Sequence, residues 1–353
     1  MSKHQSSYQG KRKLFIPILL VVILGAAGLF TLQKADRAEI EYDEEVLTKE
    51  AAVLSDVVDV GGIACVPKKN IRSYLIMGID DTAERGEDYV MGGQCDVLNL
   101  LVVDHTNMTY RYLPINRNTI CDVRWYDVDG NDMGTSEIQI AVSHAVGDGG
   151  TFSCENTVEA VSNYLGGVEI QNYIAMNIAS IKTINQLVGG VTVTIEDDFS
   201  AIDPSLVKGE VITLTDEQAE TFVRARMSMK DDGTNEARMH RQQVFIDALC
   251  EQMLKKAKAD GDYALEVYRR LEPEMVTEMN GKAFSRLING LTECENLGPI
   301  EITGSIGVDD LGYATFVADR NSVRDAAIAL FYKPADVSPS HLSPGTSIFS
   351  AEE

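Results

Sequence analysis

Three charged residues in the 353-residue sequence stand at the ends of short apolar runs, where they could act together on a phosphate group. Asp80 directly follows one run, Asp96 directly precedes the next, and Arg117 closely follows the third. The runs span residues 73–79, 97–104 and 109–115, which suits buried strands. If these strands are successive antiparallel neighbours, as short connections favour, their ends alternate and the three side chains meet at one end of the sheet.

Two carboxylates beside an arginine suit a divalent cation next to a phosphate. Mg²⁺ (or Mn²⁺) takes oxygen ligands and is commonly shared with substrate phosphates, and guanidinium groups bind phosphate oxygens in pairs. The alternative is that Asp80 and Asp96 only begin and end turns, which is a common role for aspartate. Spacing alone favours this second interpretation.

A second charged group follows about a hundred residues later. Arg224 and Arg226 lie at the end of a predicted helix, 216–223, whose start at Thr215 has the spacing of a capping box with Gln218. A polar loop separates this helix from a second one, predicted at 237–256, which carries Arg238, Arg241 and Gln242 near its start.

The second predicted helix should point its arginine toward the protein interior. Arg238, Gln242, Phe245 and Leu249 share one face because they are four, three and four residues apart. That face is apolar farther along, so Arg238 needs an anionic partner to offset its burial. A protein carboxylate is one candidate partner. A multiply charged ligand such as a phosphate is the other, since the guanidinium fork matches its oxygens.

The composition argues against a nucleic-acid partner. The chain has 31 Lys+Arg against 54 Asp+Glu, a formal net charge of −23 at pH 7. Binding to nucleic acid requires clustered basic residues that neutralise phosphates. We interpret most of the acidic excess as a solubilising surface.

Residues 15–32 are predicted to form a single membrane-spanning helix. This run contains no charged residue and is just long enough to cross a bilayer. Lys11, Arg12 and Lys13 precede it and an acidic stretch follows, which predicts a cytoplasmic N-terminus and an extracellular remainder anchored at the cell membrane. The alternative is a cleaved signal peptide, whose apolar core is usually about 7–15 residues.

The rest of the chain predicts one α/β domain in which helices cover both faces of a sheet. Further helices are expected at 155–165 and 178–187, a strand at 191–195, and a closing strand–helix pair within 317–331. The predicted division is a cytoplasmic tail, an anchor, a stalk, an extracytoplasmic domain and a disordered tail, at residues 1–14, 15–32, 33–69, 70–333 and 334–353.

The six cysteines do not show the C-x-x-C spacing of zinc or redox sites. An exported chain permits disulfides, and we expect Cys121 and Cys154 to pair because both lie in polar, loop-like segments.

Residues 74–253 resemble the LytR–CpsA–Psr family of cell-wall glycopolymer ligases, in a branch typical of clostridia-like Firmicutes. The resemblance rests on short motifs, their order and the apolar N-terminal run. The motifs are Met77–Asp80, Asp96, Ile115-Asn116-Arg117, Gly189-Gly190-Val191, Arg224-Ala225-Arg226 and Arg238-Met239-His240-Arg241-Gln242. The resemblance implies a three-layer α-β-α sandwich with a central mixed sheet.

Members of this family move a glycopolymer, such as teichoic acid or capsule, from a polyprenyl-pyrophosphate carrier to peptidoglycan, forming a phosphodiester bond. The resemblance implies that Asp80 and Asp96 hold Mg²⁺ and that the polyprenyl chain lies in an apolar groove between sheet and helices. It assigns catalysis to Arg117, Asp96 and Asn118. The pyrophosphate would be bound by Arg117, Arg224, Arg226, Arg238 and Gln242.

The sequence departs from the family pattern at four positions. Asn118 stands where an aspartate is usual, Gln139 replaces a frequent lysine, His144 a frequent tyrosine, and Asn235 an aspartate. Loss of a general base typically costs about 10²–10⁴-fold in rate. Two alternatives to ligation therefore remain, namely a catalytically weakened lipid-binding or regulatory protein and a pyrophosphatase acting on the same lipid.

Overall fold

The computed structural model describes residues 56–81, 92–127, 129–225, 234–336 and 347–349. The chain divides into Met1–Val57 and Val58–Glu353, and the second unit is described below. The predicted tail, anchor and most of the predicted stalk lie outside the described residues. Within the described ranges, no helix is both long and apolar enough to cross a membrane.

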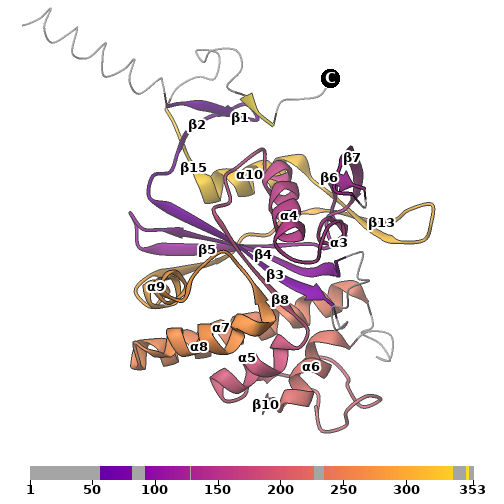
Figure 1. The fold of residues 1–353 in the computed structure, drawn as a ribbon, viewed down its shortest axis with the longest axis vertical. Coiled ribbons are helices and arrows are strands. Elements are labelled where there is room, and N and C mark those ends of the chain that lie inside the picture. Colours follow the sequence, from indigo (N-terminus) through magenta and orange to yellow (C-terminus); the bar gives the residue numbers. More distant parts are fainter. Residues whose placement is uncertain (1–55, 82–91, 128, 226–233, 337–346, 350–353) are drawn as a thin grey trace, which may run out of the picture. The chain divides into compact units, whose positions relative to one another are not determined.

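A mixed six-stranded sheet forms the centre of this unit, with the order β11-β8-β3-β4-β5-β12 (Figure 1). The strands are β3 (Ile71–Asp80), β4 (Gln94–Asp104), β5 (Thr109–Ile115), β8 (Asn172–Asn177), β11 (Met275–Val276) and β12 (Glu295–Pro299). As predicted, β3, β4 and β5 are antiparallel neighbours. Parallel pairing of β8 with β3 and of β12 with β5 makes the sheet mixed.

Helices cover both faces of the sheet (Figure 1). On one face, α5, α6, α7, α8 and α9 share an apolar core with the sheet, and on the other α4 and α10 do so. The helices are α3 (Val142–Ala145), α4 (Thr151–Tyr164), α5 (Ser180–Val188), α6 (Asp216–Arg224), α7 (Asn235–Ala259), α8 (Tyr263–Leu271), α9 (Gly281–Leu291) and α10 (Arg320–Phe331). This arrangement confirms the predicted α/β class with a central mixed sheet.

Local sequence signals set several helix boundaries. The capping box of α6 is formed, with Thr215 Oγ1 accepting from Gln218 N at 3.2 Å. Gly189 ends α5 in the left-handed region at φ +84°, where a glycine is favoured. The helix predicted at 155–165 instead begins at Thr151, where Asp148 Oδ1 accepts hydrogen bonds from Gly150 N and Ser153 N.

Four smaller sheets surround the central one. A four-stranded sheet combines β1 (Val58–Val60), β2 (Ile63–Pro67), β15 (Tyr332–Pro334) and β16 (Ser347–Ile348). The two-stranded sheets are β6 (Ile120–Tyr126) with β7 (Asp132–Gln139), β9 (Thr192–Thr194) with β10 (Val211–Thr213), and β13 (Gly304–Val308) with β14 (Ala314–Ala318). The predicted closing strand–helix pair corresponds to β14 and α10.

The small sheets correct two predicted boundaries. The folded unit begins at Val58 rather than at residue 70, because β2 pairs with both β1 and β15. Ser347–Ile348, expected in a disordered tail, pairs with β1. The strand predicted at 191–195 is only three residues long and pairs with β10 outside the central sheet.

The predicted Cys121–Cys154 disulfide is absent, and all six cysteines are free thiols. Cys154 lies in α4 rather than in a loop, fully buried, with its Sγ 3.8 Å from His144 Nε2. Cys121 lies in β6, where burial, followed by the nearby Asp122, raises the pKa of its thiol to about 12. The two thiols therefore lie in separate elements, Cys121 in β6 and Cys154 in α4, and do not form a disulfide.

Candidate active site

The ends of β3, β4 and β5 bring charged side chains together as the antiparallel pattern predicts. Asp96 Oδ1 lies 3.0 Å from Arg117 Nη1, and both side chains are mostly buried. Arg117 also donates a hydrogen bond to Gln94 Oε1 on the neighbouring strand. Asp80 ends β3 opposite Gln94 and is exposed. The predicted meeting of these residues at one end of the sheet is confirmed.

Arg238 joins this group from the start of α7. Its Nη1 lies 3.1 Å from Asp96 Oδ2, and its side chain is 10% exposed. One carboxylate therefore bridges two guanidinium groups that are far apart in sequence. Arg238 therefore has a protein carboxylate as its partner, which was one of the two interpretations of the sequence. Because Asp96 contacts both Arg117 and Arg238, it links the two predicted clusters.

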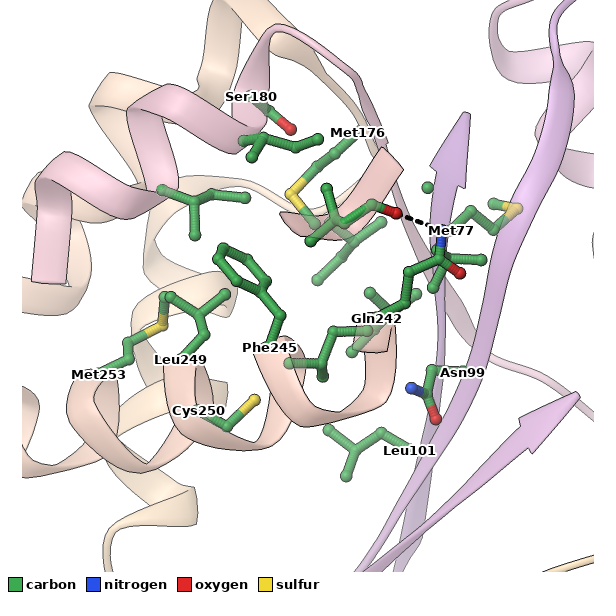
Figure 2. A pocket seen from close by; sticks show the side chains of 18 of the residues that line it. Met77, Asn99, Leu101, Met176, Ser180, Gln242, Phe245, Leu249, Cys250 and Met253 are labelled. Atoms are coloured by element: carbon green, nitrogen blue, oxygen red, sulfur yellow. Dashed lines mark hydrogen bonds between the residues drawn. The ribbon is translucent and has the colours of Figure 1, made fainter. Parts of the chain in front are cut away.

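Arg224 and Gln242, two further residues predicted to bind the pyrophosphate, lie near this charged group. Arg224, at the end of α6, is 44% exposed and pairs with Glu220 at 2.8 Å. Gln242 Nε2 donates to the Val223 carbonyl at 3.3 Å, which links α7 to α6 (Figure 2). Arg226 falls within residues 226–233, outside the described part of the chain.

Arg241 has a structural role. It is 2% exposed, its Nη1 lies 2.5 Å from Asp197 Oδ2, and it donates to the carbonyls of Phe222 and Ala225. Its guanidinium also lies 5.8 Å from the centre of the Phe199 ring. Arg241 therefore fastens α7 to the end of α6, while Arg238, three residues earlier, faces the charged group at the sheet end.

A cavity of about 820 Å³ extends from this charged group into the protein between the sheet and α5, α7 and α9. Its charged end includes Asp80, Asp96, Arg224 and Arg238, with Gln242 beside them. The remaining wall is largely apolar and includes Ile76, Ile174, Ile181, Phe245, Leu249, Met253, Leu254, Leu271, Phe284, Leu287 and Leu291. In Figure 2 Phe245 and Leu249 project from α7 toward the interior of this cavity. We call this charged end, together with Arg117 beside Asp96, the rim.

A short chain of polar groups interrupts the apolar wall, and the sequence interpretation did not identify it. Asn99, 4% exposed, donates to Gln243 Oε1 at 3.2 Å, and Gln243 donates to Asp247 at 2.8 Å. Tyr112 donates to the same carboxylate at 2.9 Å. Burial, then the bond to Asp247, raises the pKa of Tyr112. A polar residue within the apolar run at 97–104 was the signal available for Asn99.

The rim offers two carboxylates as ligands for the divalent cation that the sequence predicts. No cluster of three or more His, Cys, Asp or Glu side chains suits a metal within the described residues. Asp80 and Asp96 do fit Mg²⁺, which typically takes one or two carboxylates together with water and substrate phosphates. A divalent cation there would add positive charge opposite a pyrophosphate.

Three of the positions that depart from the family pattern, Asn118, Gln139 and His144, lie outside the cavity lining. Asn118 is 7% exposed, lies outside the cavity lining, and accepts a hydrogen bond from Phe316 N through its carbonyl at 2.8 Å. Gln139 Nε2 donates to the Ala314 carbonyl at 2.6 Å. His144 Nδ1 lies 2.8 Å from the Gly93 carbonyl oxygen. Asn235 lies in the first turn of α7.

The mixed α/β fold, the charged rim and the apolar cavity can be assigned to a protein family, because a family model matches this chain. The chain belongs to the LytR_cpsA_psr family, whose model matches residues 31–327. The resemblance inferred from the sequence motifs is confirmed.

Individual relatives agree with this assignment. The chain is 30% identical over 236 residues to the polyisoprenyl-teichoic acid--peptidoglycan teichoic acid transferase TagU of Bacillus mycoides (strain KBAB4), covering 65% of this chain and 70% of that protein. TagU of Bacillus subtilis (strain 168) is also 30% identical over 236 residues, covering 65% and 69%.

Solved structures share the fold at low sequence identity. Bacillus subtilis TagV superposes with a TM-score of 0.56 at 23% identity, covering 74% of this chain and 97% of TagV. TagT bound to LIIa-WTA gives 0.56 at 19%, covering 74% and 90%. The Streptococcus agalactiae protein gbs0355 gives 0.61 at 17%, covering 76% and 92%.

Proposed function

We propose that this protein is a membrane-anchored phosphotransferase that moves a glycopolymer from a polyprenyl-pyrophosphate carrier to peptidoglycan. One observation carries the proposal: a single cavity joins a rim of carboxylates and arginines to a deep apolar interior. A polyprenyl pyrophosphate has the same division into a charged head and an apolar chain. The names of the TagU relatives describe such a transfer for those proteins.

The proposed reaction uses the rim to position and neutralise the pyrophosphate. A sugar hydroxyl of peptidoglycan attacks the phosphorus atom that carries the glycopolymer. A new P–O bond forms, the bond to the bridging oxygen breaks, and polyprenyl phosphate leaves while the hydroxyl proton passes to solvent. Arg117, Arg224 and Arg238 stabilise the charge that develops on the phosphate oxygens, because phosphoryl transfer depends mainly on positioning and electrostatics.

Asp96 positions two of these arginines. Its two oxygens contact Arg117 and Arg238 at 3.0 and 3.1 Å, which fixes both guanidinium groups before substrate arrives. Mg²⁺ held by Asp80 and Asp96 would supply additional positive charge to the phosphates. The apolar wall would hold the polyprenyl chain and align the head with the rim.

The location is part of the proposal. The uncharged run at 15–32 and the bases before it would keep the folded unit at the outer face of the cell membrane, where the carrier lipid presents its head. Anchoring would confine the search for substrate to the plane of the membrane.

A release assay tests the proposal. The full-length chain, in detergent micelles with Mg²⁺, should release polyprenyl phosphate from a polyprenyl pyrophosphate that carries a glycan. Asp96→Ala and Arg224→Ala should each lower the rate by about 10²–10³-fold, the usual effect of removing one stabilising group. Arg124→Ala is a matched control, because Arg124 forms exposed ion pairs with Asp132 and Glu159 away from the cavity. Equal rates for the parent, Asp96→Ala and Arg224→Ala would contradict the assigned site.

The burial of Asn118 favours a second candidate, a lipid-binding protein with weakened catalysis. The backbone carbonyl of Asn118 accepts a hydrogen bond from Phe316 N. Its neutral side-chain amide stands where the family commonly has an acid. Tight binding of polyprenyl pyrophosphate without turnover, together with turnover restored in Asn118→Asp, would establish this candidate. Release of polyprenyl phosphate with no glycan joined to peptidoglycan would instead indicate hydrolysis by water.

A further inference from the structure

The cavity wall contains a buried polar side chain with an unpaired oxygen. Asn99 lines the cavity from β4 and is 4% exposed. Within the described residues, its Oδ1 atom is buried and has no hydrogen-bond partner. In Figure 2 the Asn99 side chain lies on the cavity side of β4, between Gln242 and Leu101. Buried polar atoms almost always have a partner, so an unpaired oxygen in a cavity wall is a candidate ligand contact.

The hydrogen bonds behind Asn99 determine which of its two amide atoms stays unpaired. An ionised carboxylate accepts hydrogen bonds and cannot donate them, so Asp247 orients Gln243. Gln243 Nε2 donates to Asp247 at 2.8 Å, which leaves Gln243 Oε1 to accept from Asn99 Nδ2 at 3.2 Å. Turning the Asn99 amide over would place two amide oxygens against each other. Asn99 Oδ1 is therefore the atom that remains for a ligand.

Tyr112 supports the same orientation from β5. Its hydroxyl donates to Asp247 Oδ1 at 2.9 Å, the oxygen that Gln243 also contacts. Burial, followed by the hydrogen bond to Asp247, raises the pKa of Tyr112, so the hydroxyl keeps the proton that it donates. Two donors thus converge on one carboxylate, and the chain of bonds runs in one direction from Asn99 to Asp247.

The position of Asn99 places the unpaired oxygen inside the cavity rather than at the rim. Asn99 follows Asp96 by three residues on β4, which corresponds to about 10 Å along a strand. Its neighbour across the sheet is Ile76, and Leu101 and Phe245 also line the cavity. A ligand that reaches Asn99 therefore has most of its surface against apolar side chains.

This surrounding selects a ligand with one hydrogen-bond donor joined to an apolar chain. An unpaired acceptor requires an O–H or N–H group, which neither an ionised phosphate nor a hydrocarbon chain supplies. A hydroxyl provides that donor with the least added volume. We propose that the cavity binds a long-chain alcohol, whose hydroxyl donates to Asn99 Oδ1 and whose chain packs against the apolar wall. This inference goes beyond the proposed function, because an alcohol carries no phosphate to transfer.

Titration calorimetry with farnesol and farnesyl methyl ether tests this site, because the two probes differ in the hydroxyl donor. The full-length chain is titrated in detergent micelles, with protein-free micelles as the blank. The parent should bind farnesol about tenfold more tightly than the ether, the usual upper effect of one hydrogen bond. Asn99→Leu should remove this preference, because leucine has a similar volume and no acceptor. Asn163→Leu is the matched control, exposed on α4 at the other face of the sheet, and should keep the preference.

Gln243→Leu tests the orientation separately and decides the matter if Asn99→Leu does not fold. Without Gln243 the Asn99 amide can turn its N–H groups toward the cavity and donate to the ether oxygen, so the preference for farnesol should fall. Equal affinity of the parent for both probes, or an unchanged preference in either folded variant, would overturn the proposal. If the parent preferred farnesol but released no polyprenyl phosphate, the proposed transfer would fail and the alcohol site would stand.

Discussion

Leu75 and Ile76 are adjacent on β3 but lie in two different environments. Leu75 is fully buried in the core that the sheet shares with α4 and α10. Ile76 is partly buried and lines the cavity beneath α5, α7 and α9. One face of the sheet is packed closed and the other borders a cavity, although β3 carries apolar side chains on both faces.

The difference shows how one sheet can provide both stability and a binding site. On the closed face even polar side chains are packed: Ser143, Cys154 and Thr157 are fully buried, and Ser143 Oγ hydrogen-bonds to Thr157 at 3.1 Å. Burial, followed by the nearby Asp96, raises the pKa of the Cys95 thiol, which therefore stays neutral. On the hollow face, α7 contacts β4 through the Asn99–Gln243 hydrogen bond, and Phe245 borders the apolar cavity.

Truncation should produce the largest contrast between the two faces. Leu75→Ala should lower the free energy of unfolding by about 2–5 kcal/mol, because it leaves a new void in a packed core. Ile76→Ala should cost only about 1 kcal/mol, since this side chain already borders open space. Urea unfolding of both variants checks this prediction, and equal losses would show that the two faces are packed alike.

Enlargement at the same two positions should sharpen the contrast. Leu75→Phe should destabilise the fold by about 1–3 kcal/mol, because a close-packed core resists added volume. Ile76→Phe should leave the unfolding midpoint nearly unchanged while weakening the binding of polyprenyl phosphate, because the ring would occupy the cavity. Intact lipid affinity in a folded Ile76→Phe protein would argue that the lipid chain binds elsewhere.

A smaller effect should follow from the polar bonds that join α5 to α6 on the hollow face. Asp216 accepts hydrogen bonds from Asn185 and Gln186 at 2.9 and 2.6 Å, and these bonds, first that from Asn185, lower its pKa. Because the pKa of Asp216 is lower in the folded state than its ordinary value of 3.8, the ionised carboxylate stabilises the fold above pH 3.8. This stabilisation is lost as the pH falls from 3.8 through the pKa of the folded state.

Asp216→Asn should therefore be less stable than the parent at pH 7, and the difference should shrink as the pH falls below about 4. Thermal unfolding of both proteins between pH 7 and pH 3 measures this change. A difference that stayed constant across that range would show that the ionised carboxylate contributes nothing beyond its shape.

Local patterns were sufficient for much of the fold. The apolar runs predicted β3, β4 and β5 and their order, because short connections between strands leave few other arrangements. The Thr215–Gln218 capping box marked the start of α6 correctly, since it acts within one turn. The disulfide prediction was wrong because loop-like composition did not reveal that Cys154 lies within the buried part of a helix.

The site shows where local patterns reach their limit. Asp96 and Arg117 were expected to meet because one sheet joins them, and their contact followed from strand order. The pairing of Asp96 with Arg238 crosses more than a hundred residues and depends on where α7 packs. The sequence left a carboxylate and a phosphate as candidate partners for Arg238. A buried charge requires a partner of opposite charge, but the sequence pattern does not identify which one.

The sequence by itself determined the central strands β3, β4 and β5, several of the helices, the family that the chain resembles and which residues carry charge. Those properties arise from neighbouring residues, through side-chain alternation, capping and motif order. The tertiary structure alone decided that one face of the sheet is hollow, that Asp96 bridges two arginines, and that Asn99 lies in the wall of the cavity. These features depend on how distant segments pack, because the space left between a helix and a sheet is set by all the side chains around it.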